Sequence, residues 1–264
     1  LITEKKGKKT GGKKREIGFL SSFNHLIRIE KIGKYFSYVC SAVASLALVF
    51  IIGFIVIKGA PQVKWDLLFG EFVLAEKISI FPSIVTTLIT VAISLVIALP
   101  TGIATAVFLN EYTKKNSIFV KVIRGAINVL SGISSIAYAL FGMVTFVVWF
   151  GNKISILAGS FTIAIMLLPT IVRSTEESLK AVGEGLREGS LALGAGKVRT
   201  IFKIVLPSAL PGITSAIILS IGRVVSESAP FMYTMGSTLS PMPTGVMDSG
   251  TTLAVALYKL SGEG

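Results

Sequence analysis

Two opposite charges lie inside an otherwise apolar part of the chain, and their types and spacing suit the handling of an anion. Arg223 and Glu227 are four residues apart, so on a helix their side chains would lie one above the other. Because a charge at the centre of a membrane helix costs about 3 kcal/mol even on lenient scales, we expect both to face the interior of a helix bundle. The planar fork of arginine fits a tetrahedral oxyanion, and a nearby carboxylate would weaken the attraction enough for the anion to leave. The pair therefore predicts either the lining of an anion pathway or a self-compensating ion pair that only holds helices together.

A second pattern lies in the charged segment 173–203 and the apolar run that follows it. The chain gives Glu188-Gly189-Ser190-Leu191, then Gly194, and after nine intervening residues Ile204-Val205-Leu206-Pro207. Glycines divide the segment into short pieces whose apolar residues recur at helical spacing. Short amphipathic helices of this kind suit docking into a groove on a partner, although composition alone also fits helices that lie on lipid headgroups.

The elements that must position these residues are membrane helices. Only 15% of the 264 residues are charged, 52% are hydrophobic and the mean hydropathy is +0.77, whereas soluble chains average about 25% charged residues. A helix needs about 20 mostly apolar residues to cross the hydrocarbon core. Five charge-free runs have this length: 35–57, 78–110, 125–152, 154–172 and 204–222. The sequence thus predicts an all-α, polytopic helix bundle and excludes a soluble enzyme or a disordered chain.

Lysine and arginine set the expected orientation, because positively charged loops resist translocation. If residues 1–34 are cytoplasmic, 20 of the 26 Lys and Arg fall on the cytoplasmic side, five fall outside, and Arg223 stays in the membrane. We therefore expect a multi-pass protein with a cytoplasmic N-terminus. It would have a basic arm over 1–34, a first span over 35–57 and an extracytoplasmic loop over 58–80.

The two ends of the chain differ in composition, and each carries a prediction of its own. The lysines and arginines within 5–15 form a basic, low-complexity arm, which predicts a topology signal or contact with anionic lipid heads. Nucleic-acid binding is not expected, since neither aromatic side chains nor a folded nucleic-acid-binding motif accompanies these basic residues. Residues 229–264 contain no further apolar run of spanning length. They would lie outside after five spans, and we expect that a sixth span is missing from this chain.

The spacing that starts at Glu188 resembles the EAA loop of ABC-importer permeases. In that family a glutamate and two small residues, a glycine, and an isoleucine-any-leucine-proline occur at this distance, and the loop inserts into the ATP-hydrolysing subunit. Gly189 and Ser190 stand here in place of two alanines. The resemblance implies a type I ABC-importer permease fold over 81–264. It also implies that the ATPase coupling interface comprises Glu188, Gly189, Ser190, Leu191, Gly194, Ile204, Leu206 and Pro207.

Other stretches are similar to one branch of that family. Residues 222–234 (GRVVSESAPFMYT), 108–112 (FLNEY), 186–210 and 252–264 resemble the A-type permease subunit of the bacterial high-affinity phosphate ABC importer. The resemblance implies that Arg223 and Glu227 belong to the substrate pathway. It further implies a bacterial inner membrane location and four kinds of partner: a C-type permease subunit in a heterodimer, two copies of an ATP-binding subunit, an extracytoplasmic phosphate-binding protein, and membrane lipid.

The chain itself lacks a recognisable nucleotide site. Residues 194–197 (GAGK) look like the end of a phosphate-binding loop, which requires G-x-x-x-x-G-K-[ST]. Leu191 and Val198 occupy the first glycine position and the final hydroxyl position. The one histidine, His25, lies in the N-terminal arm, which leaves no Ser/His/Asp set and no metal cluster. We therefore expect a non-enzymatic subunit without a cofactor of its own, and ATP with magnesium on the partner ATPase.

The sequence leaves two alternatives to a phosphate permease. A permease of the same class for sulfate or molybdate would carry a similar loop and would differ over 223–234 and in FLNEY. An ATP-independent channel or a membrane scaffold would have no use for the loop. Within FLNEY, we expect Glu111 to anchor this segment against Lys114 or Lys115 rather than to act as a gate.

Overall fold

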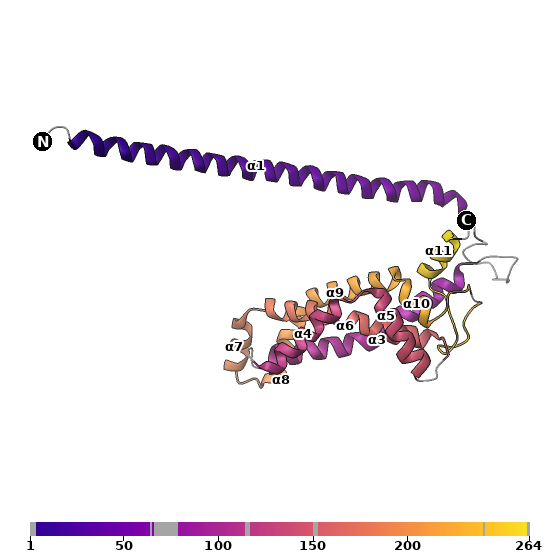
Figure 1. Cartoon of the computed structure of the whole chain (residues 1–264). Helices are drawn as coiled ribbons and strands as arrows, with labels where there is room; N and C mark the ends of the chain where they lie inside the picture. Colours follow the sequence, from indigo (N-terminus) through magenta and orange to yellow (C-terminus); the bar gives the residue numbers. More distant parts are fainter. Residues whose placement is uncertain are drawn as a thin grey trace. The chain divides into compact units, whose positions relative to one another are not determined.

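A computed structural model describes residues 4–63, 65, 79–113, 117–149, 153–239 and 241–262 (Figure 1). All regular elements within these ranges are helical. The chain divides into two compact units, Leu1–Lys64 and Trp65–Gly264. Four described helices are long and apolar enough to cross a membrane, and a bent helix pair supplies a fifth span. The prediction of an all-α, multi-pass helix bundle is thereby confirmed.

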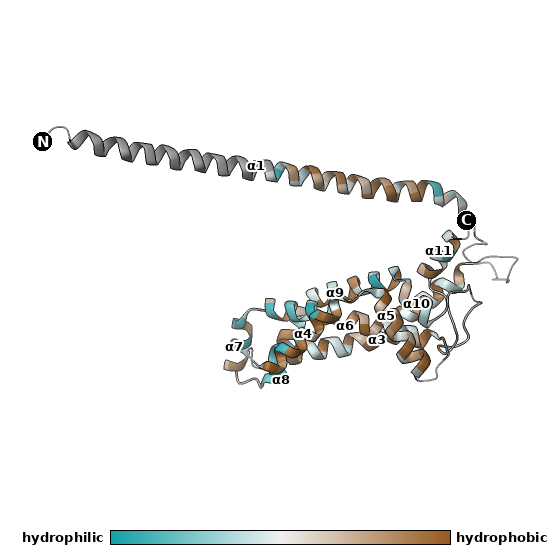
Figure 2. Cartoon of the chain, in the orientation of Figure 1, coloured by the Kyte–Doolittle hydropathy of each residue, from teal (hydrophilic) through white to brown (hydrophobic). Residues whose placement is uncertain are grey.

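The first unit is one long helix, α1 (Glu4–Gly59), followed by the 3-10 turn η1 (Ala60–Gln62). Its apolar stretch Gly33–Gly59 has the length and the hydropathy of a membrane span (Figure 2). A helix that is apolar all round suits lipid contact. The predicted span 35–57 falls inside this stretch, whereas most of the predicted loop 58–80 lies outside the described residues.

The second unit is a bundle of helices. Its elements are α3 (Phe81–Val107) with the π-helical turn η2 (Phe108–Tyr112), α4 (Ile118–Gly132), α5 (Ser135–Gly142) with η3 (Met143–Trp149), α6 (Ile156–Ala181), α7 (Glu184–Ala192), α8 (Lys197–Thr200) with η4 (Ile201–Val205), α9 (Leu206–Ser226), α10 (Ala229–Thr234) and α11 (Leu253–Gly262). One end of the bundle carries α7 and α8, and the opposite end carries α10 and α11 (Figure 1). These are called the α7 end and the α11 end below.

Helix α6 forms the centre of the bundle, with α3 and α9 packed against it. Towards the α11 end, the fully buried side chains include Ile156, Leu167 and Phe231. Towards the α7 end, Leu179 and Val205 belong to a second buried cluster. The core is thus built from the same apolar runs that predict the spans.

The predicted third span, 125–152, is not one straight helix. It consists of α4 and of α5 with η3, and the two parts are bent by 103°. Ile133 is extended between them, and the Ser134 side chain caps the new helix by accepting from the Ala137 amide. The Tyr138 hydroxyl donates to the carbonyl of Leu130 at 2.8 Å, so one carbonyl freed by the break keeps a partner.

The bent pair still joins the two ends of the bundle. Val120, in the first turn of α4, belongs to the buried cluster at the α7 end. Phe146 of η3 stacks on Phe161 near the start of α6, with ring centroids 5.6 Å apart. The pair therefore contacts both ends of the bundle, as one broken span would.

Residues after α9 are part of the bundle rather than a loose outer tail. Phe231 of α10, Met235 and Val255 of α11 are fully buried. The backbone amide of Leu253, at the start of α11, donates to the Thr87 hydroxyl of α3 at 2.9 Å. Helix α11 has 10 residues, which is shorter than a span.

Close packing of α5 on α6 yields a stability prediction at Gly142. An ideal Cβ there would lie 2.8 Å from Thr162 Cβ and closer still to that side chain's other atoms. Gly142→Ala should lower the free energy of unfolding by about 1–3 kcal/mol, as overpacking usually does. Gly125→Ala is the matched control, because a Cβ at Gly125 meets nothing within 4 Å. Unfolding in detergent would measure both, and equal effects of the two substitutions would contradict the packing described here.

Candidate functional site

Arg223 and Glu227 meet at the end of α9. Their Nε and Oε1 atoms are 3.6 Å apart. The expectation that both lie on one helix is wrong for Glu227, because α9 ends at Ser226 and Glu227 is extended. Pro230 explains the end, since it has no N–H to donate to the carbonyl of Ser226.

Arg223 also contacts α6. Its Nη1 donates to the Thr170 hydroxyl at 3.3 Å. The side chain of Arg223 is 40% exposed and that of Glu227 is 19% exposed. The pair is thus held by the bundle, but part of the Arg223 side chain stays exposed.

The helix break in the third span lies close to this pair. Gly132 and Ser134 are exposed there, and the Tyr138 hydroxyl of α5 reaches back to the Leu130 carbonyl of α4. Irregular backbone at membrane depth is tolerated only where protein covers it or water fills a cavity. The exposed charge and the exposed break therefore require protein or water, rather than lipid, on this face of the bundle.

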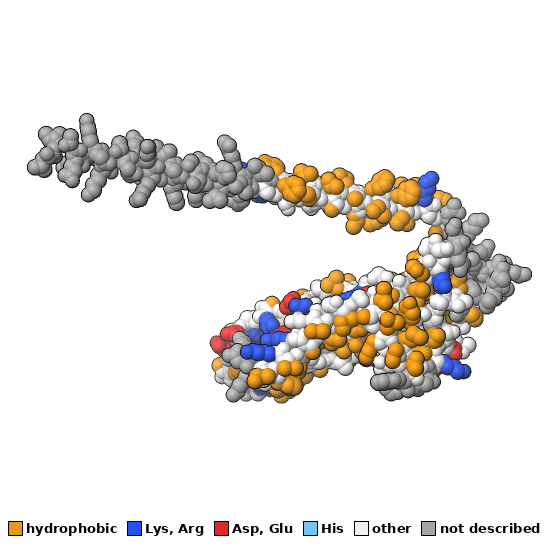
Figure 3. Space-filling model, viewed as in Figure 1, with side chains coloured by type: hydrophobic (Ala, Val, Ile, Leu, Met, Phe, Trp, Pro, Cys, Tyr) orange, Lys and Arg blue, Asp and Glu red, His pale blue; other side chains and the backbone are white. Residues whose placement is uncertain are grey.

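The α7 end holds most of the charged side chains that Figure 3 shows on this face of the second unit. Residues 173–181 of the predicted coupling segment belong to α6, and the segment leaves the bundle only at Val182. Gly194 has a φ of +81° and ends α7, a backbone conformation that favours glycine. Its amide donates to the carbonyl of Leu191 at 2.9 Å. This turn reverses the chain from α7 towards α8.

The predicted coupling residues divide between the surface and the interior. Ser190 is buried and shares a 2.8 Å hydrogen bond with the hydroxyl of Thr200, which holds α7 against α8. The exposed ones are Glu188, Gly189, Leu191, Gly194 and Pro207, while Ile204 and Leu206 are half-buried. With the 90% exposed Leu193 beside them, the exposed residues form an acidic and apolar surface of the kind that contacts a protein.

Sequence reasoning missed the side chains that tie α7 to the bundle. Arg187 forms an ion pair with Glu111 of η2 at 3.0 Å. The expected partners of Glu111, Lys114 and Lys115, lie outside the described residues.

Glu176 of α6 pairs with Arg124 of α4 and with Lys180, the latter at 2.8 Å. Glu176 and Lys180 have the helical i,i+4 spacing, but periodicity gives no signal for Glu176 with Arg124 or for Arg187 with Glu111, which are 52 and 76 residues apart.

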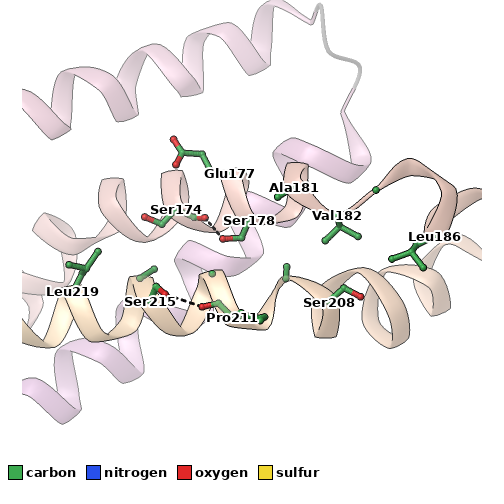
Figure 4. A pocket seen from close by; sticks show the side chains of 14 residues that line it. Ser174, Glu177, Ser178, Ala181, Val182, Leu186, Ser208, Pro211, Ser215 and Leu219 are labelled. Carbon is green, nitrogen blue, oxygen red and sulfur yellow. Dashed lines mark hydrogen bonds between the residues drawn. The ribbon is translucent and has the colours of Figure 1, made fainter. Parts of the chain in front are cut away.

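A groove of about 670 Å³ runs between α6 and α9 at the α7 end. Most of its lining residues are small, among them Ser174, Ser178 and Ser215 (Figure 4). The hydroxyls of Ser178 and Ser215 already donate to carbonyls of their own helices, at 2.7 and 3.1 Å. Two of the four serine hydroxyls that line the groove are thus already used within their own helices.

At the α11 end, a turn around Asp248 closes the start of α6. Its carboxylate Oδ2 accepts hydrogen bonds from the Thr244 amide, the Thr244 hydroxyl and the Gly245 amide at 2.7–2.9 Å. The carbonyls of Asp248 and Val246 accept from the amides of Ile156 and Leu157, which lack partners within α6.

These hydrogen bonds make the turn sensitive to acid. The hydrogen bonds from Thr244 and Gly245 hold the pKa of Asp248 below its ordinary value. The stabilisation is therefore present above the unfolded pKa, about 3.9, and is lost as the pH falls through the lower folded value. Amide exchange at Thr244 and Gly245 should rise in that pH range, and Asp248→Asn should remove the acid step. An acid step of the same size in Asp248→Asn would contradict this assignment.

Comparison with known proteins gives a consistent set of relatives. A family model described as binding-protein-dependent transport system inner membrane component matches residues 98–260. A probable ABC transporter permease protein, YqgI of Bacillus subtilis, is 29% identical over 85% of this chain and 81% of its own. The phosphate transport system permease protein PstA of Mycobacterium leprae is 33% identical over 79% of this chain and 70% of its own. PstA 1 of Mycobacterium tuberculosis is 35% identical over 76% of this chain.

The same kind of fold is found among solved structures. An inward-facing MetNI methionine ABC transporter has a chain with a TM-score of 0.50 and 21% identity. The match covers 70% of this chain and 79% of that one. At this identity the likeness concerns the fold, and it confirms the predicted permease bundle.

Proposed function

Because this chain belongs to the family of binding-protein-dependent transport system inner membrane components, and within it to the PstA-type permeases, we propose that it forms half of a phosphate translocation pathway. The observation that carries the proposal is the 33–35% identity to phosphate transport permeases over 76–79% of the chain. The chain acts as a transport subunit and not as an enzyme. It would open alternately to each side of the membrane in a cycle driven by ATP.

The geometry at the end of α9 supports an anion pathway. Arg223 is the cation that would attract phosphate, and its side chain is 40% exposed, which would let the anion approach. Glu227, 3.6 Å away, would limit the strength of that attraction, because transport requires release as well as binding. Thr170 would hold the guanidinium in place through its hydroxyl. A pair that served only to lock helices would have no need of an exposed face.

The surface of α7 supports coupling to an ATPase. Glu188, Leu191 and Leu193 project from a short helix that is anchored behind by Ser190. A helix of this kind fits a groove on a partner protein. ATP and magnesium would be bound by that partner, and this chain would hold no cofactor of its own.

The proposed assembly follows from the same resemblance. It contains this chain, a C-type permease subunit, two ATP-binding subunits and an extracytoplasmic phosphate-binding protein, in a bacterial inner membrane. The C-type subunit would cover the face that carries Arg223 and the helix break. With the N-terminus in the cytoplasm, the α7 end is cytoplasmic and the α11 end faces the binding protein.

Two measurements test the proposal. Native mass spectrometry of the purified assembly should give one copy of this chain, one of the second permease and two of the ATPase. Uptake of radiolabelled phosphate by vesicles holding that assembly should be inhibited by unlabelled phosphate and not by sulfate or molybdate. Inhibition by sulfate or molybdate would instead assign the chain to another oxyanion.

A further inference from the structure

One side chain, Arg187, connects α7 to two other helices. Its Nε and Nη2 donate to Oε1 of Glu111 at 3.3 and 3.0 Å. Its Nη1 donates to the carbonyl of Val182, and Nη2 also donates to the carbonyl of Leu179, both at 2.7 Å. The side chains of Arg187 and Glu111 are 20% and 10% exposed. Such shielded, charge-assisted bonds are stronger than ion pairs on an open surface.

The partners of Arg187 explain why it is held so firmly. Leu179 and Val182 lie at the C-terminal end of α6, where carbonyls have no partner within the helix. Glu111 lies in η2, which continues α3 without a break. Asn110 fixes the same carboxylate oxygen by donating to it at 2.9 Å. One guanidinium thus joins the ends of α3 and α6 to the helix that carries Glu188.

A second contact lies on the other side of the exposed turn. The Lys197 ammonium, at the start of α8, lies 5.2 Å from the centre of the Tyr112 ring, which is within range of a cation–π interaction. Tyr112 is the neighbour of Glu111 in η2. A cavity of about 200 Å³ between these contacts is lined by Glu111, Arg187, Leu191, Lys197, Thr200 and Ile201. The segment 188–196 is therefore attached to η2 at both of its flanks.

The chain connection alone transmits movement poorly at this point. Helix α6 ends at Ala181 and α7 begins at Glu184. Only Val182 and Gly183 join them, and a Cβ at Gly183 would meet nothing within 4 Å. A displacement of α7 would reach α6 through this link and through the hydrogen bonds of Arg187 to the end of α6, whereas the contact to α3 depends on side chains alone.

We propose that Arg187 is a positioning residue that transmits movement of α7 to α3 through Glu111, with Lys197 and Tyr112 as the second attachment. The proposal rests on the proposed function in one respect, namely that α7 contacts the ATPase. It adds that η2 is the part of the permease that receives the movement, and that α3 moves together with the coupling segment.

The test compares Arg187→Gln and Glu111→Gln with Lys180→Gln in the complete assembly in nanodiscs. Lys180 is a cation on the last turn of α6 whose ion pair is with Glu176 of the same helix. The ratio of phosphate transported to ATP hydrolysed should fall about tenfold in each of the first two variants, as loss of a charged hydrogen bond predicts. It should stay within about twofold of wild type in the control. The double variant Arg187→Gln with Glu111→Gln should be no worse than either single variant.

A second readout does not depend on the substrate. Hydrogen exchange of the η2 amides should rise in Arg187→Gln and stay at the wild-type level in Lys180→Gln, with the ATPase still bound. Unchanged exchange together with an unchanged transport ratio in Arg187→Gln would overturn the proposal, as would equal losses in the control. If the wild-type assembly hydrolyses ATP but moves no phosphate, the proposed function fails, while the exchange measurement still decides the role of Arg187.

Discussion

Replacing Arg223 by alanine should lower phosphate uptake about 100-fold, equivalent to about 2.7 kcal/mol. The substitution removes the cation that would attract the anion, and it leaves the half-buried carboxylate of Glu227 without its partner. Uptake would be measured in vesicles that hold the complete assembly, with insertion and subunit content verified. Arg223→Lys should also be impaired, because an ammonium cannot reproduce the planar fork.

Arg173→Ala is the matched control for this experiment. Arg173 is an exposed arginine of α6, so its removal changes the net charge equally and should leave uptake near the wild-type rate. Unchanged uptake in Arg223→Ala, with the protein inserted and assembled, would show that the Arg223 and Glu227 pair only holds helices together.

Reversing the charge of Glu188 should separate the permease from its ATPase. Glu188 is exposed on α7, and its replacement by lysine would place a cation where the partner surface meets a carboxylate. Because like charges across an interface cost several kcal/mol, we expect the affinity for the ATPase to fall at least about 100-fold. Copurification of the ATPase and ATP-driven uptake should be lost together.

Glu177→Lys provides the comparison for this charge reversal. Glu177 is an exposed glutamate of α6 outside α7, and its reversal should leave the ATPase bound. Normal copurification and uptake in Glu188→Lys would refute the assignment of α7 as the coupling interface.

The spans were predictable because lipid imposes a simple requirement on sequence. A run of about 20 apolar residues must form a helix there, since its backbone has no water to bond with. The bend at Ile133 follows a different rule. Its signal is the polar, glycine-containing stretch 131–135 (SGISS), which is typical of a turn but is easily read as part of an uncharged run.

The pathway and coupling residues could be named from spacing, but their surroundings could not. Glu227 was placed on a helix because four-residue spacing favours that reading, although Pro230 already indicated that the helix must end. The contact between Arg187 and Glu111 spans 76 residues of sequence. It depends on how α3 and α6 pack, and no local pattern encodes that. The same holds for the hydrogen bond from Arg223 to Thr170.

The central claim is that this chain carries phosphate through a pathway driven by ATP hydrolysed on a partner. It is tested most directly by uptake of radiolabelled phosphate into vesicles holding the complete assembly, with and without ATP inside the compartment where α7 lies. We expect uptake that requires hydrolysable ATP, resists excess sulfate and molybdate, and disappears in Glu188→Lys. Phosphate uptake that proceeds equally without ATP would contradict it and would indicate a channel.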